Sequence, residues 1–303
     1  MSATGKGVAA AGTAAALLIL SGCGQGAADA GGKLQVVAAE NVWGSIAQQL
    51  GGNRVEVTSI ITNPASDPHD YEPTSADARA MAGARLAIVN GIGYDSWASR
   101  LLAANPTPGR VTLDVGDLLG LAAGDNPHQW YSPAAVRRMV RAISADYRKL
   151  EPGHGAYFAH RRAAFETNAL ARYRRLLAQI RRRYAGTPVG ASESIFAPLG
   201  SALGLRLLTP ASFLDAISEG TEPTPADKAT VDRQIATGRI AVWVYNPQNA
   251  TPDIQRLNEA ARRAGIPIVT VTETLVPAGA SFESWQVREL EALRAALAKA
   301  AAG

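Results

Sequence analysis

The feature that most constrains the fold is a repeated alternation of short apolar runs with stretches of helical periodicity. Apolar runs of five to eight residues read as strands, and they cover residues 34–39, 54–60, 85–90, 110–115, 187–192, 205–209, 239–246 and 266–271. Helical patterns separate the runs within each group of four. Because strands that alternate with helices form largely parallel sheets, each group predicts one α/β lobe.

The two groups are joined by a stretch that has no strand pattern. A helical pattern runs from Pro133 to about Leu150, breaks at Glu151-Pro152-Gly153, and is followed by a long helical pattern over 155–184. At 1.5 Å per residue the second helix would be about 45 Å long, enough to run along both lobes. We therefore predict an N-terminal lobe over 34–150, an interlobe helix over 151–185 and a C-terminal lobe over 186–303.

The first residues have the pattern of a secretory signal. Lys6 precedes an apolar run over 8–20 that is too short to span a bilayer stably. The run ends in Leu20-Ser21-Gly22-Cys23, which looks like a bacterial lipobox, and Cys23 is the only cysteine in the chain. We expect 1–23 to be a lipoprotein signal peptide with its lipobox, 24–33 to be a flexible tether, and acylated Cys23 to anchor the protein. An ordinary cleaved signal is the alternative.

The charge balance argues against one class of partner. The chain has 30 lysines and arginines against 26 acidic residues, a net charge of +4. The excess is small and the arginines are mostly spread along predicted helices, so we expect a solvated face and no nucleic-acid binding.

Polar side chains with metal affinity follow several of the predicted strands, at the edge where open α/β sheets bind ligands. His69 lies in the loop after 54–60, His128 in the loop before the first interlobe helix, and Glu193 and Glu273 follow the strands at 187–192 and 266–271. Two imidazoles and two carboxylates suit a divalent transition metal. Taken singly, each also fits a loop, cap or surface role. The polar residues that could support such ligands are Asn41, Asn246 and Gln248.

Both histidines follow a proline, in "DPHDYEPTSAD" (67–77) and "NPHQWYSP" (126–133). These motifs and their spacing resemble those of the bacterial metal-binding lipoproteins that deliver zinc or manganese to ABC importers, the cluster with a helical interlobe backbone. The resemblance covers essentially the whole mature chain and includes "NGIGYDSW" (90–97), "ASESIFAPLGSALGL" (191–205) and "VTETL" (271–275).

The resemblance implies a two-lobed fold with a metal site in the interlobe cleft, formed by His69, His128, Glu193 and Glu273. It also implies Zn²⁺ or Mn²⁺ as the transported ion, an ABC permease and its ATPase as partners, and a monomer on the extracytoplasmic face of the cell membrane, without enzymatic activity. The chain departs from zinc-specific members, which often carry a histidine-rich loop where 114–127 has none and a histidine where Glu193 stands. Glu273 also replaces the usual aspartate. The choice between zinc and manganese therefore stays open.

Two alternative functions belong to other classes. An envelope metallohydrolase would use three of these ligands and an activated water, but the sequence has no HExxH motif and no general base beside a metal pair. A receptor for an organic solute or siderophore would need an apolar pocket, and it would leave the two Pro-His loops unexplained.

Overall fold

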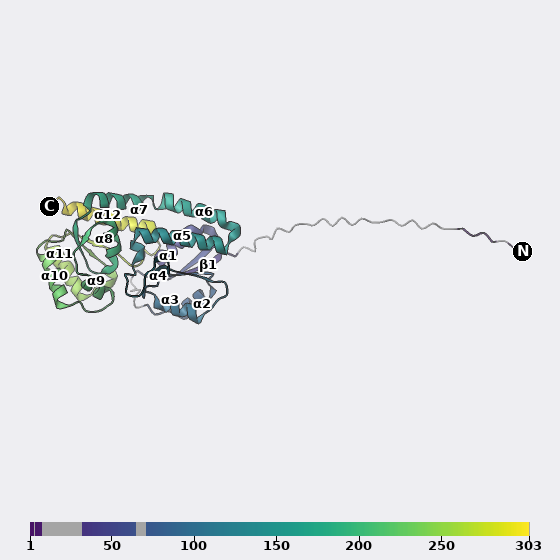
Figure 1. Ribbon diagram of the computed structural model, residues 1–303, viewed down its shortest axis with the longest axis horizontal. Coiled ribbons are helices and arrows are strands. Elements are labelled where there is room, and N and C mark those ends of the chain that lie inside the picture. Colours follow the sequence, from purple (N-terminus) through teal and green to yellow (C-terminus); the bar gives the residue numbers. More distant parts are fainter. Residues whose placement is uncertain (3, 8–31, 65–70, 303) are drawn as a thin grey trace. The chain divides into compact units, whose positions relative to one another are not determined.

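The structure, a computed structural model, describes residues 1–2, 4–7, 32–64 and 71–302 (Figure 1). The chain divides into two units, Met1–Gly32 and Lys33–Gly303, and the second unit contains both predicted lobes. Cys23 and His69 lie outside the described residues, so the lipid anchor and the role of His69 stay predictions. Among the described residues, none of the helices is long and apolar enough to cross a membrane.

Each lobe is built on a parallel four-stranded sheet, and the strand order is the same in both. The first sheet has the order β2-β1-β3-β4 and the second has the order β6-β5-β7-β8. The strands are β1 (Leu34–Glu40), β2 (Val55–Ile61), β3 (Leu86–Val89), β4 (Val111–Asp114), β5 (Pro188–Ala191), β6 (Arg206–Leu207), β7 (Val242–Tyr245) and β8 (Ile268–Thr270). All eight predicted strands and the two-lobed α/β fold are confirmed. In each sheet the order reverses between the first and third strands, the position where such sheets bind ligands.

Helices cover the faces of both sheets. Those of the N-terminal lobe are α1 (Asn41–Gly51), α2 (Ser75–Gly83), α3 (Ser96–Ala104) and α4 (Val115–Leu119), and those of the C-terminal lobe are α8 (Ala197–Leu203), α9 (Ala211–Ser218), α10 (Pro225–Ala236) and α11 (Pro252–Arg263). Short 3₁₀ turns complete the chain: η1 (Gly52–Arg54), η2 (Gln129–Tyr131), η3 (Pro152–His154), η5 (Ser194–Phe196) and η6 (Pro247–Asn249). Several helices begin at a residue whose side chain caps the free backbone N–H groups. At the start of α2, Thr74 and Asp77 form a capping box.

The N-terminal lobe ends with α5 (Pro133–Leu150). The predicted interlobe range holds α6 (Gly155–Ala164), the π-helical turn η4 (Phe165–Ala169) and α7 (Ala171–Tyr184). In Figure 1, α5 lies along α6, and the last helix, α12 (Phe282–Ala300), lies along α7. The predicted helix over 155–184 is therefore interrupted, with Leu170 N donating to Phe165 O at 3.0 Å. Phe165 and Leu170 are five residues apart, and the wider π turn lets both stay buried.

One hydrophobic core runs through the second unit. It extends from β1 through α5 and α7 to β7, with Val36, Ile143, Ile180 and Val244 among its members, while smaller clusters fill the opposite face of each sheet. Each fully buried aliphatic side chain of this size contributes about 1.5–3 kcal/mol. The continuous core therefore holds the carboxyl ends of the two sheets in a defined arrangement.

Candidate metal centre

Side chains from both lobes meet where the two sheets reverse their strand order. Glu193 follows β5, Asn246 follows β7 and Glu273 lies just beyond β8, while His128 immediately precedes η2. The exposed fractions of His128, Glu193 and Glu273 are 0%, 1% and 0%. Burial at this level is unusual for carboxylates and requires polar partners.

The orientation of the His128 ring is set by Asn126. The Asn126 side-chain oxygen lies 3.1 Å from His128 Nδ1 and accepts a hydrogen bond from the His128 backbone N at 3.0 Å. Because this oxygen is an acceptor, Nδ1 carries the proton and the lone pair is at Nε2. The Asn126 amide nitrogen donates to Ser194 O at 2.7 Å, which ties the histidine loop to the residue after Glu193. Trp130 packs edge-on against the ring.

The two glutamates are joined by one amide group. Asn246 Nδ2 donates to Glu193 Oε1 at 2.6 Å and to Glu273 Oε1 at 2.9 Å. The second oxygen of Glu193 accepts from Asn249 Nδ2 at 2.9 Å, and that of Glu273 accepts from the Tyr94 hydroxyl at 2.6 Å. These donors are neutral, so they orient the carboxylates without cancelling their charge. Two buried carboxylates held this close together favour a bound cation.

The geometry fits a metal ion between the imidazole and the nearer carboxylate. His128 Nε2 lies 3.9 Å from Glu273 Oε2. Bonds from zinc to nitrogen and oxygen are each about 2 Å, so an ion placed between these atoms could reach both with little movement. In the part of the chain that the structure describes, no group of three or more His, Cys, Asp or Glu side chains already has ion-binding geometry.

The three predicted supporting residues occupy different positions. Asn246 contacts both glutamates, as described above. Gln248 accepts a hydrogen bond from the Glu273 backbone N at 2.6 Å through its side-chain oxygen and donates to Thr274 Oγ1 at 3.0 Å. Asn41 accepts from Leu275 N at 3.1 Å, so it holds the segment after Glu273.

Three residues contact the candidate ligands directly but were not predicted from the sequence: Tyr94, Asn126 and Asn249. Tyr94 lies within "NGIGYDSW" (90–97), Asn126 stands two residues before His128, and Asn249 stands three residues after Asn246. For Asn126 and Asn249, the available signal in the sequence was a polar residue within three positions of a residue already predicted for the site.

A half-buried acid, Glu289, supports the segment that carries Glu273. Glu289 Oε1 accepts from Thr272 N at 3.2 Å, and Glu289 Oε2 accepts from the Tyr131 hydroxyl at 2.7 Å. Tyr131 also contacts the Thr272 carbonyl at 2.9 Å. Burial raises the pKa of Glu289 to about 8 and raises the pKa of Tyr131 well above its ordinary value.

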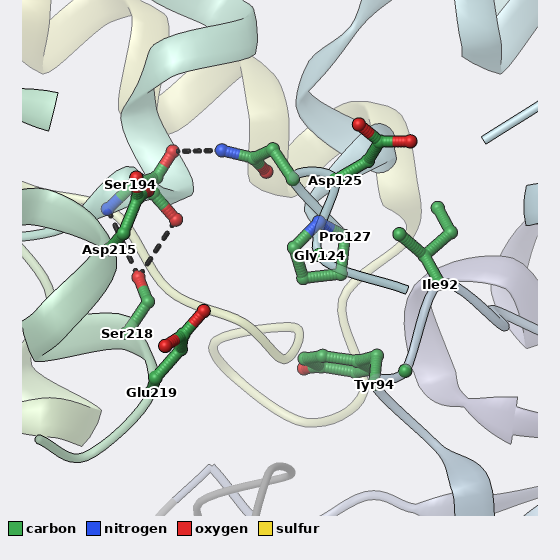
Figure 2. A pocket seen from close by; sticks show the side chains of 11 residues that line it. Ile92, Tyr94, Gly124, Asp125, Pro127, Ser194, Asp215, Ser218 and Glu219 are labelled. Carbon is green, nitrogen blue, oxygen red and sulfur yellow. Dashed lines mark hydrogen bonds between the residues drawn. The ribbon is translucent and has the colours of Figure 1, made fainter. Parts of the chain in front are cut away.

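A small cavity adjoins the centre. Figure 2 shows Tyr94 on one side of it and Ser194, Asp215, Ser218 and Glu219 on the other. Its volume is about 220 Å³. Pockets for drug-sized organic ligands are mostly apolar and measure roughly 300–1,000 Å³, so this cavity does not favour an organic solute.

Comparison with known proteins settles the family. A family model described as "Zinc-uptake complex component A periplasmic" (ZnuA) matches residues 36–296. The chain belongs to this family. The predicted resemblance to the metal-binding lipoproteins of ABC importers is thereby confirmed.

Curated relatives of this ZnuA-family chain include lipoproteins named for metals. The manganese-binding lipoprotein MntA of Halalkalibacterium halodurans is 30% identical over 159 residues, which cover 48% of the chain and 51% of MntA. The metal ABC transporter substrate-binding lipoprotein FimA of Streptococcus parasanguinis is 24% identical over 293 residues, which cover 89% of the chain and 91% of FimA. The chain spans about half the length of MntA and of a putative metal-binding protein of Treponema pallidum.

Solved structures share the fold of this ZnuA-family chain. The Mn-bound S38A mutant of a periplasmic metal binding protein from Candidatus Liberibacter asiaticus has a TM-score of 0.73 at 17% identity and covers 86% of this chain and 98% of its own. The substrate-binding protein FpvC from Pseudomonas aeruginosa, in complex with Mn²⁺, has a TM-score of 0.70 at 21% identity, with coverage of 88% and 99%.

Proposed function

We propose that this protein is the extracytoplasmic substrate-binding lipoprotein of an ABC importer, which captures a divalent transition metal and delivers it to the permease and its ATPase. The ion is Zn²⁺ or Mn²⁺. The observation that carries the proposal is the meeting of buried His128, Glu193 and Glu273, with His128 Nε2 facing Glu273 Oε2 at 3.9 Å. Relatives in the ZnuA family that are named as metal-binding or substrate-binding lipoproteins support it.

The proposed ligands are His128, Glu193, Glu273 and, from the sequence, His69. Four protein ligands leave no position for a reactive water, whereas catalytic zinc sites keep one open. The near-complete burial of three of these side chains fits an ion that is carried rather than used for chemistry. We therefore propose a transport receptor and not an envelope metallohydrolase.

The proposal also includes a location at the cell membrane. Acylation of Cys23 would hold it on the extracytoplasmic face of the membrane, with 24–33 as tether, because several acyl chains anchor a protein firmly. The lobes would act as a monomer beside the permease.

Metal titration tests the function. Metal-stripped protein is titrated with Zn²⁺ and with Mn²⁺ while the melting temperature and the bound metal per chain are measured. We expect one ion per chain, and at a free concentration of 100 times the Kd a gain of about 2.7 kcal/mol in the free energy of unfolding. His128→Ala and Glu273→Gln should reduce this gain, and His69→Ala tests the fourth ligand.

His154→Ala is the matched control, because His154 lies in η3, in a different segment from the proposed ligands, with Nδ1 3.5 Å from Glu151. If neither ion binds stoichiometrically or stabilises the protein, the proposed function is wrong. An unchanged affinity in His69→Ala would remove only that residue from the ligand set.

A further inference from the structure

The small net charge of the chain is the sum of two parts of opposite sign. From α5 to α7, residues 133–184 contain 13 lysines and arginines and 3 acidic residues, a net charge of +10. The rest of the chain therefore carries −6, because the whole chain carries +4. In Figure 1, α6 and α7 follow one another along one edge of the second unit. The positive charge is thus concentrated on one helical segment.

Most of these cations face solvent. All thirteen except Arg161 and Arg162 are exposed, and we call the exposed ones the basic surface. Among the described residues, Arg172 is the one of the thirteen that lies within ion-pair distance of an acid, Glu291. By contrast, Arg256 in the C-terminal lobe pairs with an acid of a neighbouring helix at 2.6 Å. Like charges that are not compensated repel one another, so the basic surface favours an anionic partner.

Three arginines of the basic surface line a groove between α5, α7 and α8, whose volume is about 550 Å³. Arg137 comes from α5, and Arg174 and Arg181 stand seven residues apart on one face of α7. Arg181 Nη1 donates to Ala202 O at 2.7 Å, which holds the guanidinium at the groove and uses one of its five N–H donors. The apolar part of the lining consists of Leu177, Ala178, Pro198 and Ala202.

This combination suits the headgroup of a phospholipid. The planar guanidinium group of arginine binds phosphate oxygens through two parallel hydrogen bonds. The apolar lining would contact the glycerol and the first acyl carbons, whereas free phosphate would leave it uncovered. The cations also continue along the helices beyond the groove. An extended anionic surface would therefore contact more of them than a small ion could.

The proposed lipid anchor would keep the basic surface close to a membrane. β1 begins at Leu34, beside the first residue of β2, which follows η1 directly. In η1, Asn53 accepts from the hydroxyl of Tyr157 of α6 at 2.8 Å, so the chain enters the second unit beside α6. The ten residues 24–33 follow Cys23 and span at most about 35 Å when extended. Held this near, a surface binds even when its intrinsic affinity is weak.

We propose that the basic surface, with its three-arginine groove, docks on an anionic phospholipid bilayer. The proposal rests on the proposed function, because it assumes the lipid anchor, and it adds a second membrane contact. The anchor would fix one end of the tether, and the basic surface would decide which side of the protein faces the bilayer. Each arginine near an anionic bilayer strengthens binding about fivefold, so the three groove arginines together contribute roughly a hundredfold.

The test uses residues 24–303, which include the whole second unit and carry no acyl chain. Co-sedimentation gives the partition coefficient on vesicles of phosphatidylcholine alone and on vesicles with equal parts of phosphatidylcholine and phosphatidylglycerol. We expect wild type to bind the mixed vesicles at low salt, to be released at high salt, and to leave the phosphatidylcholine vesicles unbound. Combining Arg137→Gln, Arg174→Gln and Arg181→Gln should lower the partition coefficient on the mixed vesicles roughly a hundredfold.

The matched control combines Arg233→Gln, Arg239→Gln and Arg262→Gln. These are exposed arginines of the C-terminal lobe, so the control has the same net charge as the groove variant. We expect it to bind the mixed vesicles within a few-fold of wild type. An equal loss in both triple variants, or no preference of wild type for the mixed vesicles, would overturn the proposal.

Two competitors distinguish the bilayer from other anions. Release of wild type by millimolar inorganic phosphate at constant ionic strength would indicate a small-anion site and would overturn the proposal. Tighter binding to duplex DNA than to the mixed vesicles would overturn it as well. Metal titration separates the proposal from the proposed function, since His128, Glu193 and Glu273 are buried on other segments and both triple variants should bind Zn²⁺ and Mn²⁺ as wild type does. If wild type bound neither ion, the proposed function would be wrong whatever the vesicles show.

Discussion

Asn246→Asp is the substitution that most directly probes the two-glutamate arrangement. The change is nearly isosteric and keeps the acceptor oxygen that receives Gln248 N at 2.9 Å. It replaces the amide nitrogen that donates to Glu193 at 2.6 Å and to Glu273 at 2.9 Å with a carboxylate oxygen. Two attractive contacts thereby become repulsive ones, and a third negative charge enters a buried site.

The magnitude follows from the two lost bonds. A hydrogen bond to a charged group contributes about 1.5–3 kcal/mol, so we expect the metal-free protein to lose about 3–6 kcal/mol of its free energy of unfolding. That is a large fraction of the roughly 5–15 kcal/mol that stabilises a typical domain. A divalent ion at the centre would offset the added charge. The loss should therefore be smaller in the metal-loaded protein.

The assay is urea denaturation followed by tryptophan fluorescence, on metal-free and metal-loaded protein. Asn258→Asp is the matched control: Asn258 is buried in the same lobe and accepts from Trp243 Nε1 at 2.7 Å, an acceptor role that aspartate keeps. Its cost should be the same with and without metal. If Asn246→Asp is as stable as wild type, or loses the same amount in both states, the account of the two-glutamate arrangement is wrong.

Two further predictions concern the supporting structure. Gly91→Ala should lower the melting temperature, because Gly91 has φ +66° and an added Cβ would lie 2.3 Å from Asp114 Oδ1, whereas Gly83→Ala, with open space around it, should not. Glu289→Gln should change how stability depends on pH. The pKa of Glu289 is about 8 in the folded protein against 4.5 ordinarily, so the folded state holds the extra proton and wild type should lose stability relative to the variant as pH rises from 5 to 8. If the difference in the free energy of unfolding between the two proteins stays constant from pH 5 to 8, Glu289 does not have a raised pKa in the folded protein.

The sequence was sufficient to predict the strands and the longer helices, because their apolar periodicity is a local property. It was insufficient for α4 and α9, which have five and eight residues and are too short for a clear helical period. The π turn after α6 was also missed, although the five-residue spacing from Phe165 to Leu170 is its signature in hindsight. That spacing becomes informative only once both side chains are known to be buried in one core.

The candidate site also has residues that the sequence could predict and residues that it could not. His128, Glu193 and Glu273 could be selected from the sequence because each follows a predicted strand or stands in a recognisable loop. The partners of these residues could not, since the bond from Tyr94 to Glu273 and the bond from Asn126 to Ser194 join segments that only the packed core brings together. Hydrogen bonds between such distant segments are set by tertiary packing, which leaves no periodic trace in the sequence.

The chemical nature of the donors explains how one site can be well ordered before binding and still attract an ion. Arginine or lysine would hold the glutamates equally well. A fixed positive charge would, however, compete with the metal ion and would have to move away when the ion binds. The amides of Asn246 and Asn249 and the Tyr94 hydroxyl instead orient Glu193 and Glu273 while leaving their charge intact. The repulsion between the two carboxylates then lowers the stability of the metal-free site, and a divalent ion relieves it. Binding affinity and stability are thereby coupled through the same two side chains.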